Sequence, residues 1–433
     1  MMNVLRQFKL WQKFAVLGAA SAVACAVPLY FVYQAETESI KVAQMERAGL
    51  PPVRHALALS QSITDHRGPA RRWIEQTTSD DSKRLALAGK IEATIKAARQ
   101  AAAEAGFAQS TKDLDAIETA WKALAEDVST RMMDVTQARE AHASLVRQTM
   151  LLIEGLADES GLSLDPVAAS YYLMTAATDH MPRLSDALIA VRVAGVSALD
   201  DATVTEAEYA TLRAQLGVAV LAAERGNRQV AKAVALESDL GNTTQAPQAA
   251  VEAALKRVGD TVLMQMTPGP KEPGMRDAFF AVLAESVAKV DALNDASLSA
   301  LDTVLAAREA TFRTERATYL GGIALLLLLC GGLAVAITRS VTRPLTHAVH
   351  VSEAIGNGDL DFAIDTAGRD EAAEVLRGFA AMQQSLRNQM AEREQRTAEA
   401  TARQQAAEAV AREVGVAVDA AVGGDFSHRI GLQ

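Results

Sequence analysis

The sequence predicts an all-α protein that two transmembrane helices anchor in a membrane. The segments Phe14 to Ala35 and Ala317 to Thr338 contain no charged residue. At ~1.5 Å per residue, each is long enough to cross a hydrocarbon core of ~30 Å. Aromatic residues make up only 4% of the chain, and alanine, glutamate, glutamine, leucine and arginine dominate long tracts that are poor in glycine. That composition is typical of long helices.

The first apolar segment, residues 14–35, is predicted to be an uncleaved anchor. Residues 1–13 before it hold Arg6, Lys9 and Lys13 and no acidic residue, which favours a cytoplasmic N-terminus. A cleaved signal peptide is the alternative. The apolar stretch is long for one, however, and lacks a clear small-x-small cleavage site near its outer end.

Residues 36–316 are expected to form a helical domain outside the membrane. Apolar residues recur at spacings of three and four in segments such as 167–199, 206–240 and 275–316, and no alternating stretch competes with them. Long helices of this kind pack most simply as one long four-helix bundle or as two stacked bundles. The last helix should continue without a break into the second apolar segment, residues 317–338.

The second apolar segment is expected to run from outside to inside. Arg339 and Arg343 follow it, with no acidic residue before Glu353. The positive-inside rule therefore places this end in the cytoplasm. Tyr319 stands where an aromatic residue of the outer interface belongs.

Two amphipathic segments joined by an irregular linker follow the second anchor. Pro344 presets the first turn of a helix, where its missing N–H costs nothing, and Gly358 is suited to ending that helix. Small or apolar residues lie three and four apart in each segment, at Leu345, Ala348, Ser352 and Ile355 and then at Val375, Phe379, Met382 and Leu386. Such narrow stripes suit a parallel coiled coil better than a globular core.

This region, residues 339–390, resembles a HAMP domain, the two-helix relay that joins transmembrane helices to output modules in bacterial receptors. The resemblance assigns signal relay to Pro344, Leu345, Gly358, Asp359, Leu360, Asp370, Glu371, Phe379 and Met382. The sequence departs from the family pattern at Ala372 and Ala373, where the family usually shows a larger apolar residue and a glycine. An ordinary juxtamembrane coiled coil is the alternative.

The remaining residues are expected to be helical at first. Residues 391–412 form a charged, alanine-rich connector in this interpretation. Residues 413–433 contain Gly424-Asp425-Phe426, which repeats the end of the first HAMP helix, so this segment resembles the front half of a second HAMP unit.

Two short motifs in residues 36–316 resemble parts of known sensors. Leu164-Asp165-Pro166, followed by residues 170–174, resembles a motif of helical periplasmic domains in proteobacterial chemoreceptors and some sensor kinases. His66-Arg67-Gly68 resembles a step found in nitrate-sensing and related helical sensors. The opening residues 8–14 are also similar to the start of many proteobacterial chemoreceptors.

These motifs suggest residues that contact a small anion, such as an organic acid. Arginine holds a carboxylate or nitrate through two parallel N–H bonds. The candidate ligand-binding residues are Arg67, Arg71, Arg72, Tyr171 and Tyr172. The alternative is that the arginines form a solvated face and the tyrosines pack in a core.

Several functions are disfavoured by the sequence. The formal charge of -10 and the lack of a basic patch with interleaved aromatics argue against nucleic-acid binding. No His-Glu-x-x-His motif and no Gly-x-Ser-x-Gly elbow occur. The protein is therefore not expected to be an enzyme within these residues, and no metal or cofactor is expected.

Together the resemblances identify the chain as similar to the input half of a methyl-accepting chemotaxis protein. They imply a homodimer in the bacterial inner membrane, with a periplasmic sensor domain that binds a small molecule. Contact with a chemotaxis kinase and coupling protein would need the helical hairpin that these residues lack. The alternatives are the input half of a sensor histidine kinase or cyclase, and a structural or adaptor protein whose helices bind another protein.

Overall fold

The computed structural model describes residues 8–201, 203–424, 427 and 431. The chain divides into two compact units. We call Phe31–Leu320 the bundle unit, and the described residues of Met1–Tyr30 with Gly321–Gln433 the HAMP unit. Arg6, Asp425 and Phe426, on which part of the sequence interpretation rests, lie outside the described residues.

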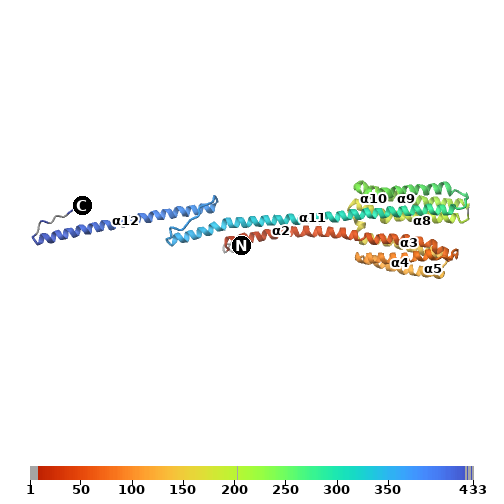
Figure 1. The fold of residues 1–433 in the computed structure, drawn as a ribbon, viewed down its shortest axis with the longest axis horizontal. Coiled ribbons are helices and arrows are strands. Elements are labelled where there is room, and N and C mark those ends of the chain that lie inside the picture. Colours follow the sequence, from red (N-terminus) through yellow and green to blue (C-terminus); the bar gives the residue numbers. More distant parts are fainter. Residues whose placement is uncertain (1–7, 202, 425–426, 428–430, 432–433) are drawn as a thin grey trace. The chain divides into compact units, whose positions relative to one another are not determined.

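The all-α prediction is confirmed (Figure 1). The α-helices are α2 (Leu10–Ala48), α3 (Leu50–Ile74), α4 (Ser82–Glu104), α5 (Ala108–Thr130), α6 (Val135–Glu159), α7 (Ala168–Thr175), α8 (Met181–Ala198), α9 (Glu206–Leu236), α10 (Gly241–Asp260), α11 (Met275–Gly356) and α12 (Glu371–Val422). Short 3₁₀ turns form η1 (Leu162–Leu164) and η3 (Ser238–Leu240), and π-helical turns form η2 (Ala176–His180) and η4 (Thr261–Gln265). One antiparallel pair of two-residue strands, β1 (Thr203–Val204) and β2 (Gly269–Pro270), joins two loops.

The helix starts follow from local sequence. Asp134 and Thr205 each form a capping box, with Gln137 for α6 and Glu208 for α9, so backbone N–H groups at these helix ends are satisfied. The chain between α6 and α7 turns at Asp165, whose carboxylate accepts a hydrogen bond from the Val167 N–H at 2.8 Å.

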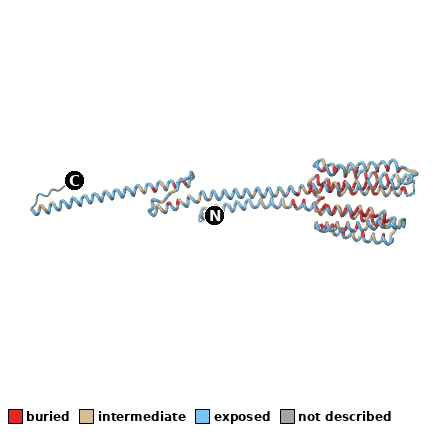
Figure 2. Tube along the Cα trace, in the orientation of Figure 1, coloured by how far each residue is buried: buried red, intermediate tan, exposed pale blue. Residues whose placement is uncertain are grey.

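The bundle unit contains two helical bundles that lie side by side rather than end to end (Figures 1 and 2). The first bundle consists of α3 to α6 around Trp121, Leu59 and Ile63. The second consists of α8, α9, α10 and the first part of α11 around Leu188 and Phe279. The helices of each bundle turn their apolar stripes inward, as amphipathic helices do.

Helix α11 links the two units in one continuous element of 82 residues. Its first residues belong to the second bundle, whereas Leu298, Leu301 and Leu305 pack in the core of the first bundle. The same helix then continues through residues 321–338 to Gly356. One helix therefore contributes to both bundle cores and to the HAMP core.

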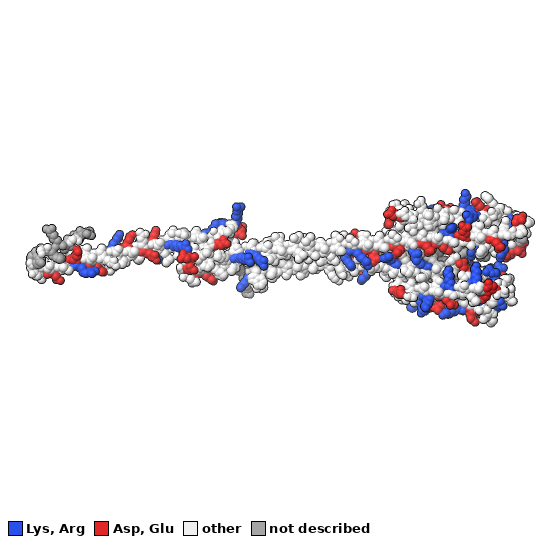
Figure 3. All heavy atoms as spheres, in the orientation of Figure 1, with Lys and Arg blue, Asp and Glu red and all other residues white. Residues whose placement is uncertain are grey.

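Two helical segments are long and apolar enough to cross a membrane. One begins in α2 and the other lies in α11, and neither apolar window is buried within the chain. The part of α11 between Arg316 and Arg339 appears in Figure 3 as a stretch without charged side chains. The chain therefore has a membrane-anchored, all-α fold.

In the HAMP unit, the end of α11 and the start of α12 pack on each other. Ala348, Val351 and Leu376 form the buried core there, with Ile355 and Phe379 packed against it. Within one chain Val351 is buried, with the linker residues Phe362 and Ile364 packed against this core, and Ser352 is exposed. The stripe through Ser352 belongs to a parallel coiled coil of two chains and stays a prediction.

Candidate functional site

Three arginines on three helices lie close enough for the charges of Arg139 and Arg192 to act on Arg67, although Arg139 itself is exposed. Arg67 lies on α3, Arg139 on α6 and Arg192 on α8, and Arg67 and Arg192 are half-buried. Burial lowers the pKa of Arg67, and the charges of Arg139 and Arg192 lower it further. Burial also lowers the pKa of Arg192. Like charges held together in partial burial are costly unless an anion joins them.

The acids near this cluster do not neutralise it through direct contacts. Asp186 attracts Arg67 and Asp65 attracts Arg192, but only at longer range. Among the described residues, the guanidinium groups of Arg67 and Arg192 make no hydrogen bond or ion pair. Arg192 instead lies 5.2 Å from the centre of the Phe280 ring. Both guanidinium groups therefore keep free N–H donors.

The other predicted ligand residues are not brought into this cluster. Arg71 forms ion pairs with Glu75 (2.8 Å) and Asp200 (3.8 Å), and Arg72 is exposed. Tyr171 is exposed and lies ring to ring with Tyr172 at 5.9 Å. Among the described residues, no hydrogen bond or ring contact joins either tyrosine to the three predicted arginines. Their role in ligand binding stays a prediction.

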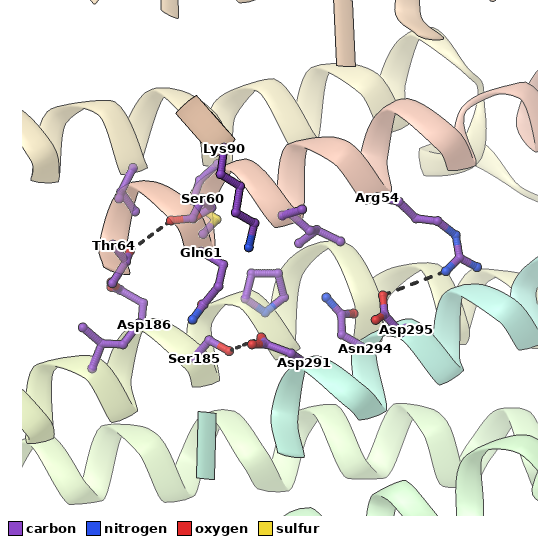
Figure 4. Close-up of a pocket in the computed structure, with 16 residues that line it drawn as sticks. Arg54, Ser60, Gln61, Thr64, Lys90, Ser185, Asp186, Asp291, Asn294 and Asp295 are labelled. Atoms are coloured by element: carbon purple, nitrogen blue, oxygen red, sulfur yellow. Dashed lines mark hydrogen bonds and ion pairs between the residues drawn. The ribbon is translucent and has the colours of Figure 1, made fainter. Parts of the chain in front are cut away.

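A cavity of about 220 Å³ lies beside the arginine cluster (Figure 4). Its walls come from both bundles: α3, α4 and α6 on one side and α8 and α11 on the other. The charged lining residues are Arg54, Lys90, Asp186, Asp291 and Asp295. Asp186 also faces Arg67, so the cavity and the cluster are neighbours.

A buried ion cluster lies further along α11. The Arg308 guanidinium donates to Asp165 at 2.7 Å and also pairs with Glu46 on α2. The Glu46 and Asp165 side chains are only 1% and 0% exposed. Arg308, whose side chain is 12% exposed, therefore joins α11 to α2, and both to the turn before α7, through two buried carboxylates.

Two buried histidines face each other in the first bundle. His66 on α3 and His142 on α6 share a hydrogen bond of 2.9 Å between Nδ1 and Nε2, and the Trp121 ring meets His66 edge to face at 5.0 Å. Burial lowers the pKa of His66 to about 3 and that of His142 to about 4. Both rings are therefore neutral at pH 7. Among the described residues, no group of three or more metal-ligating side chains occurs.

The HAMP residues identified in the sequence hold the linker between α11 and α12. Gly358 ends the helix at φ +83°, a conformation that favours glycine, and Asp370 caps α12 through the Ala373 N–H at 2.9 Å. Arg387 fixes the linker by donating to the Leu360 carbonyl at 2.6 Å and pairing with Asp361 at 2.9 Å. Asp359 lies in the linker, where its carboxylate accepts a hydrogen bond from the Asp361 N–H at 3.1 Å.

The remaining HAMP residues fall into three groups. Pro344 lies inside α11, and Glu371 begins α12. Phe379 packs on the HAMP core. Leu345 and Met382 are 39% and 44% exposed. Apolar side chains of the HAMP helices therefore remain uncovered within one chain.

Sequence reasoning missed Arg139, Arg192 and Arg308 as functional candidates. Arg192 carried a signal, because it is the only charge in the apolar run from Ala187 to Gly195. A lone charge in such a run is expected to meet a specific partner. Arg308 carried no comparable signal, since it stands among other charged residues.

Comparison with known proteins supports the assignment of a HAMP domain to this chain. Residues 336–388 match the HAMP domain family. The sensor histidine kinase MtrB of Mycolicibacterium paratuberculosis is 31% identical over 87 residues, which are 20% of this chain and 15% of that protein. The methyl-accepting chemotaxis protein NahY of Pseudomonas putida is 38% identical over 72 residues, 16% of this chain and 13% of NahY. The matches thus span about one seventh of each relative.

Among solved structures, that of the NasR transcription antiterminator aligns over 86% of this chain and 99% of its own, with 14% identity and a TM-score of 0.47. That similarity is too low to carry an argument about fold or function. The HAMP match and the two candidate spans are the firmer findings. The chain contains a HAMP domain and has the architecture of a membrane-anchored sensor that relays a signal.

Proposed function

We propose that this chain is the input half of a transmembrane chemoreceptor that binds a small anion between the two bundles of the bundle unit. The observation that carries the proposal is the continuity of α11. This one helix supplies wall residues of the cavity, then Arg308, then an apolar span, and finally the first helix of the HAMP domain. In this proposal the bundle unit lies in the periplasm and the HAMP unit begins the cytoplasmic part, at the bacterial inner membrane.

The arginine cluster is the proposed anion site. Arg67 and Arg192 come from different bundles and keep free N–H donors, and Arg139 adds a third positive charge. A planar anion such as a carboxylate or nitrate can accept two parallel N–H bonds from one guanidinium group. Its charge would relieve the repulsion among the three arginines, so binding would draw α3 and α8 together.

The proposed signal relay depends on a difference in the affinity of the anion for two arrangements of the bundles. An anion that bridges α3 and α8 better in one arrangement of the bundles shifts the population toward that arrangement. Because α11 packs in both bundle cores, the same shift moves α11 relative to α2. The continuous helix α11 then carries a small slide or rotation to Pro344 and the HAMP core.

A parallel homodimer is part of the proposal. Leu345, Val349, Val375 and Met382 are apolar HAMP residues that stay at least 39% exposed within one chain. Apolar stripes on a pair of adjoining helices are buried when two copies align in parallel. Two copies would then place four membrane helices side by side.

The first test measures anion binding to the full chain in lipid nanodiscs. We expect nitrate, acetate or succinate to raise the melting temperature above that in matched chloride. Replacing Arg67 or Arg192 with alanine should weaken binding on the order of 10- to 100-fold, because each removes a charge-assisted hydrogen-bond pair worth about 1.5–3 kcal/mol.

The matched control is Arg72→Ala, on the same helix as Arg67 but exposed. It should leave the affinity within about twofold, since the Arg72 guanidinium is free to stay solvated. The anion site is refuted if none of the three anions shifts the melting temperature. Equal losses in Arg72→Ala and Arg67→Ala would refute it as well.

A sensor histidine kinase is the second candidate, because MtrB matches about as well as NahY. Both candidates share the input mechanism and differ in the output domain. Sequencing the coding region past codon 433, together with the mass of the native membrane protein, separates them. A methylatable helical hairpin, which would bind a chemotaxis kinase and coupling protein, supports the chemoreceptor, and a kinase domain supports the alternative.

A further inference from the structure

The cavity between the bundles has a chemistry of its own, distinct from that of the arginine cluster. Three carboxylates, those of Asp186, Asp291 and Asp295, line it against two cations, Arg54 and Lys90. Arg54 is already engaged, because it lies 3.9 Å from Asp295 and donates to Ser299 at 3.1 Å. The cavity therefore retains more acceptors than donors.

Asp291 is only weakly neutralised by direct contacts. Its one direct partner among the described residues is the Ser185 hydroxyl, which donates over a long 3.4 Å. Burial raises the pKa of Asp291 to about 6, and the charges of Asp65 on α3 and Asp295 on α11 act in the same direction. Lys90 on α4 opposes them but forms no ion pair among the described residues. Figure 4 shows Lys90 and Gln61 across the cavity from Asp291.

Asn294, a second residue of the cavity wall, has a side-chain oxygen that lacks a hydrogen-bond partner within the part of the chain that the structure describes. It lies one helical turn after Asp291 on α11, on the same wall of the cavity (Figure 4). Its side chain belongs to a residue only 8% exposed, and its Oδ1 accepts no hydrogen bond among the described residues. A buried carbonyl oxygen without a donor destabilises the fold. A ligand N–H group between Asp291 and Asn294 would satisfy both.

Apolar side chains from both bundles also line the cavity: Leu57, Val146, Met150, Pro182 and Ile189. The volume of about 220 Å³ is well above the space that one water molecule needs. A ligand of only a few non-hydrogen atoms therefore fits, with a cationic head at the carboxylate and a short hydrocarbon tail.

We infer that this cavity is a binding site for a small primary amine in its ammonium form. The ammonium group donates to the Asp291 carboxylate and the Asn294 carbonyl oxygen, and the alkyl chain lies against Met150 and Ile189. This inference goes beyond the anion site and uses different residues. Because the walls belong to both bundles, an amine would act on the same α11 helix as the anion does.

The test is calorimetric titration of the full chain in nanodiscs with n-butylammonium chloride, with n-butanol as the neutral probe of the same shape. Butylammonium is expected to bind, and butanol is expected to bind at least tenfold more weakly. Asp291→Asn should weaken butylammonium binding at least tenfold, and Asn294→Leu should weaken it severalfold. Equal affinity for butylammonium and butanol, or unchanged affinity in Asp291→Asn, overturns the inference.

Folding of the variants is checked by the melting temperature without ligand. Asp291→Asn should melt at or above the wild-type temperature, because it removes a buried and poorly neutralised charge. Asp295→Asn is the matched control, since Asp295 is already paired with Arg54, and it should change the affinity less than threefold. A larger loss in Asp295→Asn than in Asp291→Asn contradicts the assignment of the ammonium position.

The pH dependence gives a second readout. Asp291 must be ionised to hold an ammonium group, and its pKa is about 6. Affinity for butylammonium should therefore be full near pH 8 and fall as the pH drops through 6. The groups that face Asp291 are Asp65, Lys90 and Asp295, and none of these carboxylates takes part in binding. Affinity that stays constant from pH 8 to pH 5 refutes the role of Asp291.

Discussion

Replacing Arg308 with methionine is expected to destabilise the bundle unit by about 3–5 kcal/mol. The substitution leaves the carboxylates of Glu46 and Asp165 without their cation, at 1% and 0% exposure. An unpaired buried charge costs far more than an exposed one. In a domain of this size, the loss corresponds to a fall in melting temperature on the order of 10 °C, which circular dichroism of the full chain in nanodiscs would record.

The matched control for Arg308→Met is Arg257→Met. Arg257 pairs with Glu285 at 2.8 Å, but both side chains are more than half exposed. Loss of such a surface pair should change the stability by less than about 1 kcal/mol. A melting temperature of Arg308→Met within about 2 °C of the control would show that the buried cluster does not hold α11, α2 and the turn before α7 together.

Acid is expected to destabilise the bundle unit through the two buried histidines. The pKa values of His66 and His142, about 3 and about 4, lie below the 6.5 of an unfolded histidine. Between these values the unfolded state binds more protons than the folded state, so stability falls as the pH drops below 6.5. Each lowered pKa unit corresponds to about 1.4 kcal/mol, which makes the total loss by pH 4 a few kcal/mol.

The double variant His66→Leu/His142→Leu isolates this effect. Carboxylates also titrate between pH 7 and pH 4, but they are the same in both proteins. The difference in the free energy of unfolding between the two proteins should therefore shift by a few kcal/mol in favour of the variant as the pH falls. Denaturant titrations at pH 7 and pH 4 measure it, and a difference that does not change with pH would contradict neutral buried histidines.

Much of the fold could be predicted from the sequence because its signals are local. The two charge-free runs, the helical spacing of apolar residues and the Gly358 and Asp370 boundaries each depend on neighbouring residues. The unbroken last helix, from the bundle unit through the span, was likewise predicted and is found as α11. Packing within the HAMP unit could not be predicted locally, because the linker residues Phe362 and Ile364 pack beside Val351 and leave Ser352 exposed.

The candidate site could be predicted only in part because it depends on contacts between distant segments. Arg67 was singled out from a short motif, but its neighbours Arg139 and Arg192 come from helices whose placement no local pattern specifies. Asp165 was singled out as part of the Leu164-Asp165-Pro166 motif. The structure shows that it also accepts a hydrogen bond from Arg308, which lies far along the chain. Charged residues that pair across bundles look like surface residues in a sequence.

The central claim is that α11 carries a change at the bundle unit to the HAMP domain. Hydrogen–deuterium exchange of the full chain in nanodiscs tests it, with nitrate, acetate and succinate each compared with chloride. The account predicts that an anion which protects peptides containing Arg67 and Arg192 also changes exchange in residues 345–358 and 371–388. Protection confined to the bundle unit, with unchanged exchange in the HAMP residues, would contradict it.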